Sequence, residues 1–137
     1  MDRSAAQAWL DAYVEAWKTY DRNQVEALFA EDVTYRYHPF DPEDEVLRGR
    51  DAVVNGWLEP DGNASTRDAE GTYEARYEVY AVDGERVVAV GTSTYYPDTT
   101  RAKPDRVYDN VFLIEFDGAG RCRDFTEYYM KEPDAEA

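Results

Sequence analysis

The sequence is poor in the residues that form disulfides and bind metal ions. Its 137 residues include a single cysteine, Cys122, and a single histidine, His38. One cysteine excludes an intrachain disulfide, and this pair is too far apart in sequence to form a metal-binding motif. We therefore expect no bound metal and a reducing, cytoplasmic environment.

Long apolar runs and a net positive charge are also missing. No stretch approaches the ~20 apolar residues of a membrane-spanning helix, and residues 1–5 do not resemble the start of a signal peptide. The 30 acidic residues outnumber the 15 basic ones, giving a formal net charge of −15 that repels nucleic acids and anionic membranes. Neither is an expected partner. The chain also has no glycine-rich phosphate loop and no nucleophile elbow, so we expect no cofactor.

Aromatic residues, by contrast, are abundant. The length fits one domain, residues 1–137, and 43% of the residues are hydrophobic, enough for one core. Twelve tyrosines are many for a core, because each buried hydroxyl group needs a hydrogen-bond partner. A partly hydrated pocket or its ligand provides such partners, which favours a small hydrophobic ligand, aromatic or polycyclic.

Helical periodicity is confined to the N-terminal half. Ser4 with Gln7, and Asp21 with Gln24, have the spacing of capping boxes and predict the starts of two helices. Residues 33–38 are β-branched and aromatic and predict a strand, and residues 49–51 predict the start of a third helix. The apolar positions of the three helices are Trp9, Leu10, Tyr13, Val14, Trp17, Val25, Leu28, Phe29, Val53, Val54, Trp57 and Leu58.

The C-terminal half alternates with a period of two, as strands do. It predicts hairpins of 73–82 with 86–96 and of 106–116 with 121–131. Residues 59–70 and 97–103 are predicted as polar loops, the second a pocket lip, and 132–137 as a flexible tail. The order predicts an α+β fold, in which a curled antiparallel sheet packs against three N-terminal helices and encloses one pocket.

Four segments carry a family resemblance: residues 13–17, 27–34, 47–53 and 116–121. In this order they resemble the nuclear transport factor 2-like superfamily, in its SnoaL-like branch, over nearly the whole chain. The resemblance implies a cone with one deep pocket and a homodimer. It implies less about function, because the superfamily contains isomerases, dehydratases, epoxide hydrolases, polyketide cyclases and non-catalytic modules.

Ketosteroid isomerases of this superfamily offer a residue-by-residue comparison. Their carbonyl-polarising tyrosine falls on Tyr13, and their general-base aspartate, followed by proline, falls on His38-Pro39, where this chain has one extra residue just before. Their second oxyanion donor, an aspartic acid, falls on Phe112. Since a phenylalanine cannot donate a hydrogen bond, the resemblance argues against steroid isomerisation but keeps the position of the pocket.

Two candidate acid/base residues follow from the chemistry of the side chains. Histidine titrates near neutral pH, which makes His38 the natural proton shuttle. The alternative is that His38 is a structural residue at the end of a strand, bonded to a backbone carbonyl.

The second candidate is Glu127. The period-two pattern places Phe125, Glu127 and Tyr129 on one face of the strand, and the isomerase comparison makes this the concave face. A carboxylate there is costly unless paired or protonated. Glu127 is therefore a functional acid/base or half of a buried ion pair, unless the strand phase is wrong and it is solvated.

Polar residues on the neighbouring strands complete the predicted site. Asn110 shares a face with Tyr108, and its amide can orient a ligand oxygen, although a bulge would place Asp109 there instead. Arg36 lies two residues before His38 on the predicted strand, so the two side chains are on the same face. Arg36 allows an ion pair with Glu127 across the cavity, similar to the arginine–carboxylate arrangement of epoxide hydrolases. Those enzymes need a second carboxylate, for which the weak candidates are Asp109 and Asp32.

Two classes of function remain open. The first is a cofactor-independent lyase, isomerase or hydrolase acting on a small hydrophobic, oxygenated molecule of aromatic, polyketide or terpenoid type. In it, His38 and Glu127 transfer protons, and Tyr13 and Asn110 bind the substrate oxygen. The second is a non-catalytic module that binds a ligand or dimerises. The residues predicted to surround the ligand are Trp17, Arg36, Trp57, Tyr108, Asp109, Phe112, Phe125 and Tyr129.

Overall fold

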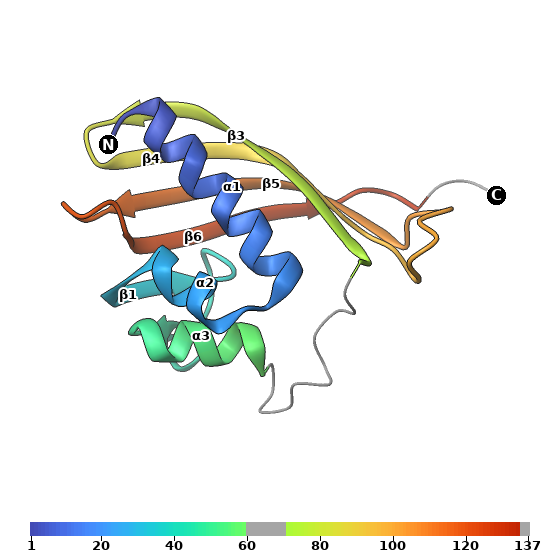
Figure 1. The fold of residues 1–137 in the computed structure, drawn as a ribbon, viewed down its shortest axis with the longest axis horizontal. Helices are drawn as coiled ribbons and strands as arrows, with labels where there is room; N and C mark the ends of the chain where they lie inside the picture. The colour runs from blue at the N-terminus through green and yellow to red at the C-terminus, as the bar shows by residue number, and fades with distance from the viewer. Residues whose placement is uncertain (60–70, 135–137) are drawn as a thin grey trace.

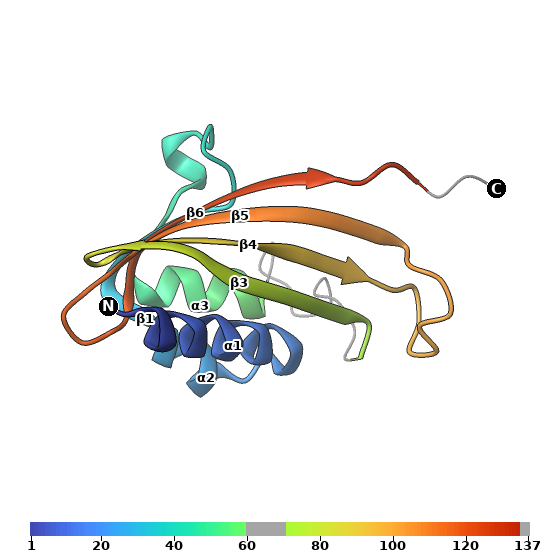
Figure 2. The same ribbon diagram turned by 90° about the horizontal axis from the view of Figure 1, so that it is seen from above.

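Three helices cover one face of a curled sheet that does not close into a barrel (Figures 1 and 2). The computed structural model describes residues 1–59 and 71–134. Within these ranges it shows the α+β architecture that the sequence predicts. The elements are α1 (Arg3–Thr19), α2 (Arg22–Leu28), β1 (Phe29–Arg36), the short 3-10 helix η1 (Glu43–Glu45), β2 (Leu47–Arg48), α3 (Arg50–Leu58), β3 (Tyr73–Asp83), β4 (Arg86–Tyr95), β5 (Arg106–Phe116) and β6 (Cys122–Lys131).

The sheet is mixed rather than antiparallel throughout. Its strand order is β2-β1-β6-β5-β4-β3, and β3 to β6 form the two predicted hairpins and the antiparallel pairing between them. The prediction is wrong at the other edge, where β1 runs parallel to β6 and pairs with the unpredicted two-residue strand β2. Local periodicity identifies a strand but not its partner, so the direction of β1 was not readable from its residues.

Only one of the two predicted helix starts has the predicted capping residue. Asp21 caps α2 as predicted, accepting a hydrogen bond from the Gln24 backbone N at 3.0 Å. For α1 the predicted capping box is wrong, because Asp2 is the cap and Ser4 lies inside the first turn. Gln7 instead ties α1 to β3: its amide donates to the Tyr77 carbonyl at 2.9 Å and accepts from the backbone N of Val79 at 3.1 Å.

Aromatic rings fill the space between the helices and the sheet. Tyr35 of β1 stacks on Phe125 of β6, with ring centroids 4.5 Å apart and planes 5° from parallel. Phe29, which the sequence places on the second helix, instead begins β1 and packs its ring edge-on against Trp57. Such contacts add about 0.5–1.5 kcal/mol each beyond the burial of area. The core therefore joins the N-terminal helices and β1 to the C-terminal strand.

The described parts of the predicted polar loops and tail lie at the surface. The loop between β4 and β5 is exposed at 97–103, as expected of a polar loop. Most of the predicted loop at 59–70 and the end of the predicted tail, residues 60–70 and 135–137, lie outside the described residues. No helix in the described part of the chain is long and apolar enough to cross a membrane.

Gly91 of β4 is required by the close approach of β3. A Cβ atom added at this position would lie 2.0 Å from the Arg76 carbonyl oxygen and 2.6 Å from the Tyr77 ring. We predict that Gly91→Ala lowers the free energy of unfolding by at least 1–3 kcal/mol, because β3 must move away. Urea unfolding measures this. The control is Gly118→Ala, where an added Cβ meets nothing within 4 Å. Equal unfolding midpoints for the two variants would contradict the prediction.

Candidate functional site

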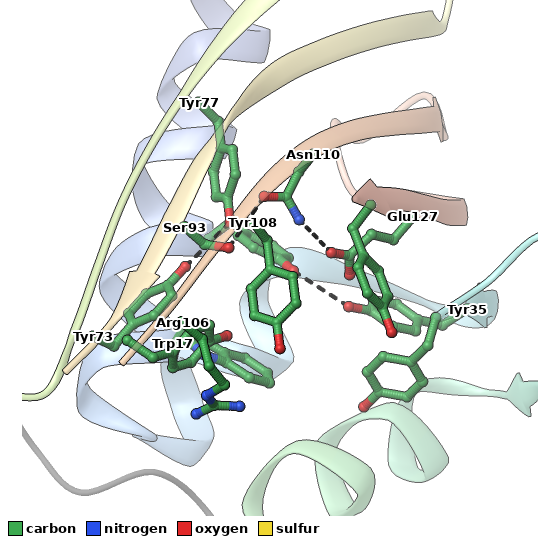
Figure 3. Close-up of a pocket in the computed structure, with 13 residues that line it drawn as sticks. Trp17, Tyr35, Tyr73, Tyr77, Ser93, Arg106, Tyr108, Asn110 and Glu127 are labelled. Atoms are coloured by element: carbon green, nitrogen blue, oxygen red, sulfur yellow. Dashed lines mark hydrogen bonds between the residues drawn. The ribbon is translucent and has the colours of Figure 1, made fainter. Parts of the chain in front are cut away.

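A cavity of about 190 Å³ lies between α1 and the concave face of the sheet (Figure 3). For comparison, an apolar protein cavity of about 150 Å³ accommodates benzene, so this partly open cavity has room for roughly one ring. The walls come from α1, from the end of β1 and from all four long strands. The lining residues are Tyr13, Trp17, Tyr35, Tyr37, Tyr73, Tyr77, Ser93, Tyr95, Arg106, Tyr108, Asn110, Glu127 and Tyr129.

Tyrosine hydroxyl groups line the cavity in neutral form. The hydroxyls of Tyr13 and Tyr35 lie 3.3 Å apart, and those of Tyr73 and Tyr77 lie 3.4 Å apart. Burial raises the pKa of Tyr13 and of Tyr35 well above the ordinary value for tyrosine, and it raises the pKa of Tyr77 to about 12. At neutral pH these side chains are therefore phenols, which donate and accept hydrogen bonds without charge.

Glu127 places a carboxyl group among these phenols. Its Oε2 accepts a hydrogen bond of 2.6 Å from the Asn110 amide, whose oxygen in turn accepts one of 3.1 Å from the Ser93 hydroxyl (Figure 3). Burial raises the pKa of Glu127 from 4.5 to about 7, although the Asn110 hydrogen bond and the nearby His38 oppose the shift. Near neutral pH the carboxyl group is therefore populated in both protonation states, as an acid/base catalyst requires.

Six of the predicted site residues line the cavity. The strand phase is the predicted one: Asn110 is 4% exposed and faces the cavity, whereas Asp109 points outward. The register explains why, since Asn110 lies opposite Gly91 on one side and Tyr129 on the other. The six are Tyr13, Trp17, Tyr108, Asn110, Glu127 and Tyr129.

His38 does not line this cavity, which corrects the predicted placement of the proton shuttle. The chain leaves β1 after Arg36 and turns toward the side of the sheet opposite the helices, where η1 also lies (Figure 2). There His38 contacts neither the cavity nor a backbone carbonyl. Its Nδ1 lies 2.8 Å from the Asp41 carboxylate, and its Nε2 lies 2.8 Å from the hydroxyl of Tyr129. Tyr129 thus connects His38 to the cavity.

Three predicted ligand-binding residues belong to the core instead. Trp57, Phe112 and Phe125 are at most 1% exposed and do not line the cavity, because other rings cover them. Phe112, at the position of the isomerases' second oxyanion donor, is therefore a packing residue here.

Arg36 and the proposed second carboxylates also lie elsewhere. Arg36 pairs with Asp124 at 3.7 Å instead of Glu127, because alternate residues of β1 and β6 face opposite sides of the sheet. Asp109 and Asp32 are exposed, and Asp109 lines a groove on the outer face. The arginine–carboxylate arrangement expected from epoxide hydrolases is therefore not formed by these residues.

Several lining residues were not among the predicted site residues. Ser93 and Tyr95 share a face of β4, and the period-two pattern of that strand is the sequence feature that places them on the cavity side. Arg106 lies with its guanidinium carbon 4.4 Å from the centroid of the Tyr95 ring and pairs with Asp105. Tyr35, Tyr37, Tyr73 and Tyr77 complete the set. Within residues 1–59 and 71–134, no group of three or more His, Cys, Asp or Glu side chains is placed to hold a metal ion.

Comparisons with known proteins agree with this architecture. The sequence profile of the SnoaL-like domain family matches residues 10–130, which confirms the resemblance found in the sequence. No curated protein matches the chain. The homodimer and the cytoplasmic location stay predictions.

Solved structures show the same fold at low sequence identity. An NTF-2 like protein of unknown function from Burkholderia xenovorans has a TM-score of 0.65 at 18% identity, covering 97% of this chain and 88% of that one. A putative ketosteroid isomerase from Kribbella flavida has a TM-score of 0.65 at 18% identity, covering 99% and 85%. An epoxide hydrolase from M. tuberculosis has a TM-score of 0.61 at 16% identity, covering 93% and 84%. At these identities the likeness concerns the fold alone.

The raised pKa of Glu127 makes stability depend on pH. The folded protein binds more protons than the unfolded chain between pH 4.5 and about 7, so the free energy of unfolding falls as the pH rises through this window. The shift corresponds to roughly 3 kcal/mol. We predict that wild type loses about this much stability relative to Glu127→Gln between pH 5 and pH 8. Urea unfolding at both pH values measures it, and parallel pH profiles of the two proteins would contradict it.

Proposed function

The chain belongs to the SnoaL-like domain family, and we propose that it is a cofactor-independent enzyme that moves a proton on a small, oxygenated, ring-sized molecule. The observation that carries this proposal is Glu127, the carboxyl group in the tyrosine-lined cavity, with a pKa raised to about 7. A carboxyl group with that pKa exchanges protons readily at neutral pH. Lyase, isomerase and hydrolase reactions all use proton transfer by a positioned side chain of this kind.

The neighbours of Glu127 suit an acid/base role. Asn110 holds Oε2 of the carboxylate at 2.6 Å, and Ser93 fixes the amide of Asn110, so the carboxyl group has one orientation. The cavity also contains phenols able to donate a hydrogen bond to an oxygen atom that gains negative charge during the reaction. Tyr13 and Tyr108 lie in the same lining and are the candidates for this donor role.

Cavity size and lining narrow the class of substrate. The cavity is partly open, and its volume of about 190 Å³ accommodates a single ring. Phe112 is buried at the position where ketosteroid isomerases have their second donor, so steroid isomerisation stays disfavoured. Small cyclic ketones and hydroxy ketones fit both the volume and the hydroxyl-rich lining.

A non-catalytic ligand-binding module is the second candidate. The paired hydroxyls of Tyr13 with Tyr35 and of Tyr73 with Tyr77 favour it, because these phenols satisfy one another without a ligand. In that case Glu127 would orient a bound molecule without transferring a proton.

Deuterium exchange at the α-carbons of cyclohexanone distinguishes the two candidates. We predict that the wild-type protein in D₂O accelerates this exchange, followed by NMR, and that Glu127→Gln lowers the rate about 10²- to 10⁴-fold, because the amide cannot take a proton. Glu78→Gln, a change of an exposed glutamate on β3, is the matched control and should keep the wild-type rate.

Equal exchange by wild type and Glu127→Gln would overturn the role of Glu127. Shifts of the cyclohexanone resonances on binding, without any exchange, would favour the ligand-binding module instead.

A further inference from the structure

A second hydrogen-bonded system reaches the cavity from the opposite side of the sheet. Tyr129 of β6 lines both the tyrosine-lined cavity and a groove of about 650 Å³ on the outer face. His38 and Phe40 line this outer groove, and the rings of these two residues stack with centroids 5.0 Å apart. The Tyr129 hydroxyl lies 2.8 Å from His38 Nε2. Asn110 and Glu127 also line both spaces, and Tyr129 is the one of these three whose hydroxyl bonds to His38.

Asp41 anchors the far end of this system. Its side chain is only 5% exposed, and a buried carboxylate must be hydrogen-bonded or paired. Both of its oxygens bond to His38: Oδ1 lies 2.8 Å from Nδ1, and Oδ2 accepts from the backbone N at 3.1 Å. The turn of residues 38–41 thus fixes the imidazole ring against the carboxylate.

These contacts decide which ring nitrogen of His38 carries the proton. An ionised carboxylate only accepts hydrogen bonds, so Nδ1 must donate to Asp41. In the neutral imidazole, Nε2 is then the acceptor, and the hydroxyl of Tyr129 donates to it. Tyr129 is 46% exposed, and the burial of the rest of its side chain, together with Tyr108, Glu127 and Asp41, raises the pKa of its hydroxyl. The phenolic proton therefore stays available for this bond. The oxygen of Tyr129 then keeps a lone pair that can accept a further hydrogen bond, and Tyr129 lines the cavity.

We propose that Asp41, His38 and Tyr129 form a proton relay that accepts a proton from a hydroxyl group of the ligand. The O–H bond of the ligand breaks as its proton forms a new O–H bond on Tyr129, while the original phenolic proton passes to His38 Nε2. The products are a ligand alkoxide and an imidazolium, which the Asp41 carboxylate stabilises. No oxidant or further reactant is needed. Tyr129 contacts the ligand, His38 receives the proton through Tyr129, and Asp41 is a positioning residue that holds the imidazole.

This relay deepens the proposed function and rests on it, since it adds a base to the acid/base group Glu127. Glu127 and Tyr129 are two residues apart on one face of β6, about 7 Å along the strand. A ring-sized ligand spans that distance. The relay therefore predicts the substrate class. The substrate is a small hydroxylated molecule, with its hydroxyl at Tyr129 and its second reacting group at Glu127.

The tautomer of His38 tests the relay without any substrate. His38 is the only histidine, so a long-range ¹H–¹⁵N spectrum of the labelled full chain contains one imidazole. We predict a proton on Nδ1 and none on Nε2 in the neutral ring. Asp41→Ala should shift the population toward the Nε2–H tautomer. Tyr129→Phe should keep the Nδ1–H tautomer and move the Nε2 resonance toward that of a nitrogen without a hydrogen bond.

Asp44→Ala, which removes an exposed carboxylate from the neighbouring η1, is the matched control and should leave the spectrum unchanged. If Asp41→Ala does not fold, the wild-type and Tyr129→Phe spectra still decide the question. An Nε2–H tautomer in the wild type, or a Tyr129→Phe spectrum identical to that of the wild type, would overturn the relay.

Phenol and anisole test the preference for a hydroxyl group. They share one ring, but only phenol carries an O–H donor. We predict that wild type binds phenol up to roughly tenfold more tightly, the effect of one hydrogen bond, and that Tyr129→Phe loses this preference while Glu127→Gln keeps it. Equal binding of the two probes by wild type, or a preference that survives in Tyr129→Phe, would refute the relay. If Glu127-dependent exchange of cyclohexanone is still observed, the proposed function of Glu127 survives without the relay. The two proposals can therefore be refuted independently.

Discussion

The parallel pairing of β1 with β6 is the constraint on which the site depends. It joins β1, which lies between α2 and α3 in the chain, to the last strand through the register of Tyr35 with Phe125, whose rings stack 4.5 Å apart. The chain then leaves the sheet directly beside Glu127 and Tyr129. As a result, one wall of the cavity and the turn that carries His38 are both placed by the same strand pair. Without this pairing β6 would be an edge strand up to Thr126, and the cavity would lose the wall formed by Tyr35 and Tyr37.

Burial of Glu127 links this architecture to chemistry. The surrounding phenols stay neutral because their own burial opposes ionisation, so they offer hydrogen bonds but no positive charge to the carboxylate. The Asn110 amide compensates only in part, and the pKa of Glu127 comes to about 7. Ionising Glu127 therefore costs the fold stability, and the same raised pKa is what the proposed acid/base role requires. This pattern, a desolvated titratable group in a small cavity, is typical of functional sites.

The sequence predicts what is local and misses what depends on the path of the chain. The hairpins and their phase, including Asn110 in the cavity and Asp109 outside, follow from period two and from turns that place Gly84 and Gly120 at positive φ. The direction of β1 is a non-local property and was predicted wrongly. The Arg36–Glu127 pair failed because strand parity places those two side chains on opposite faces. The contact of Asp41 with His38 depends on how the loop turns back, which no periodicity encodes.

The central claim is that the cavity holds a carboxyl group poised between its two protonation states near neutral pH. A ¹³C NMR titration of the glutamate side-chain carboxyl carbons measures this directly, with the Glu127 resonance assigned by its absence from Glu127→Gln. The structure predicts a midpoint of about 7 for this one resonance. A midpoint near 4.5, the ordinary value for a glutamate, would show that the carboxylate is solvated and would contradict the account.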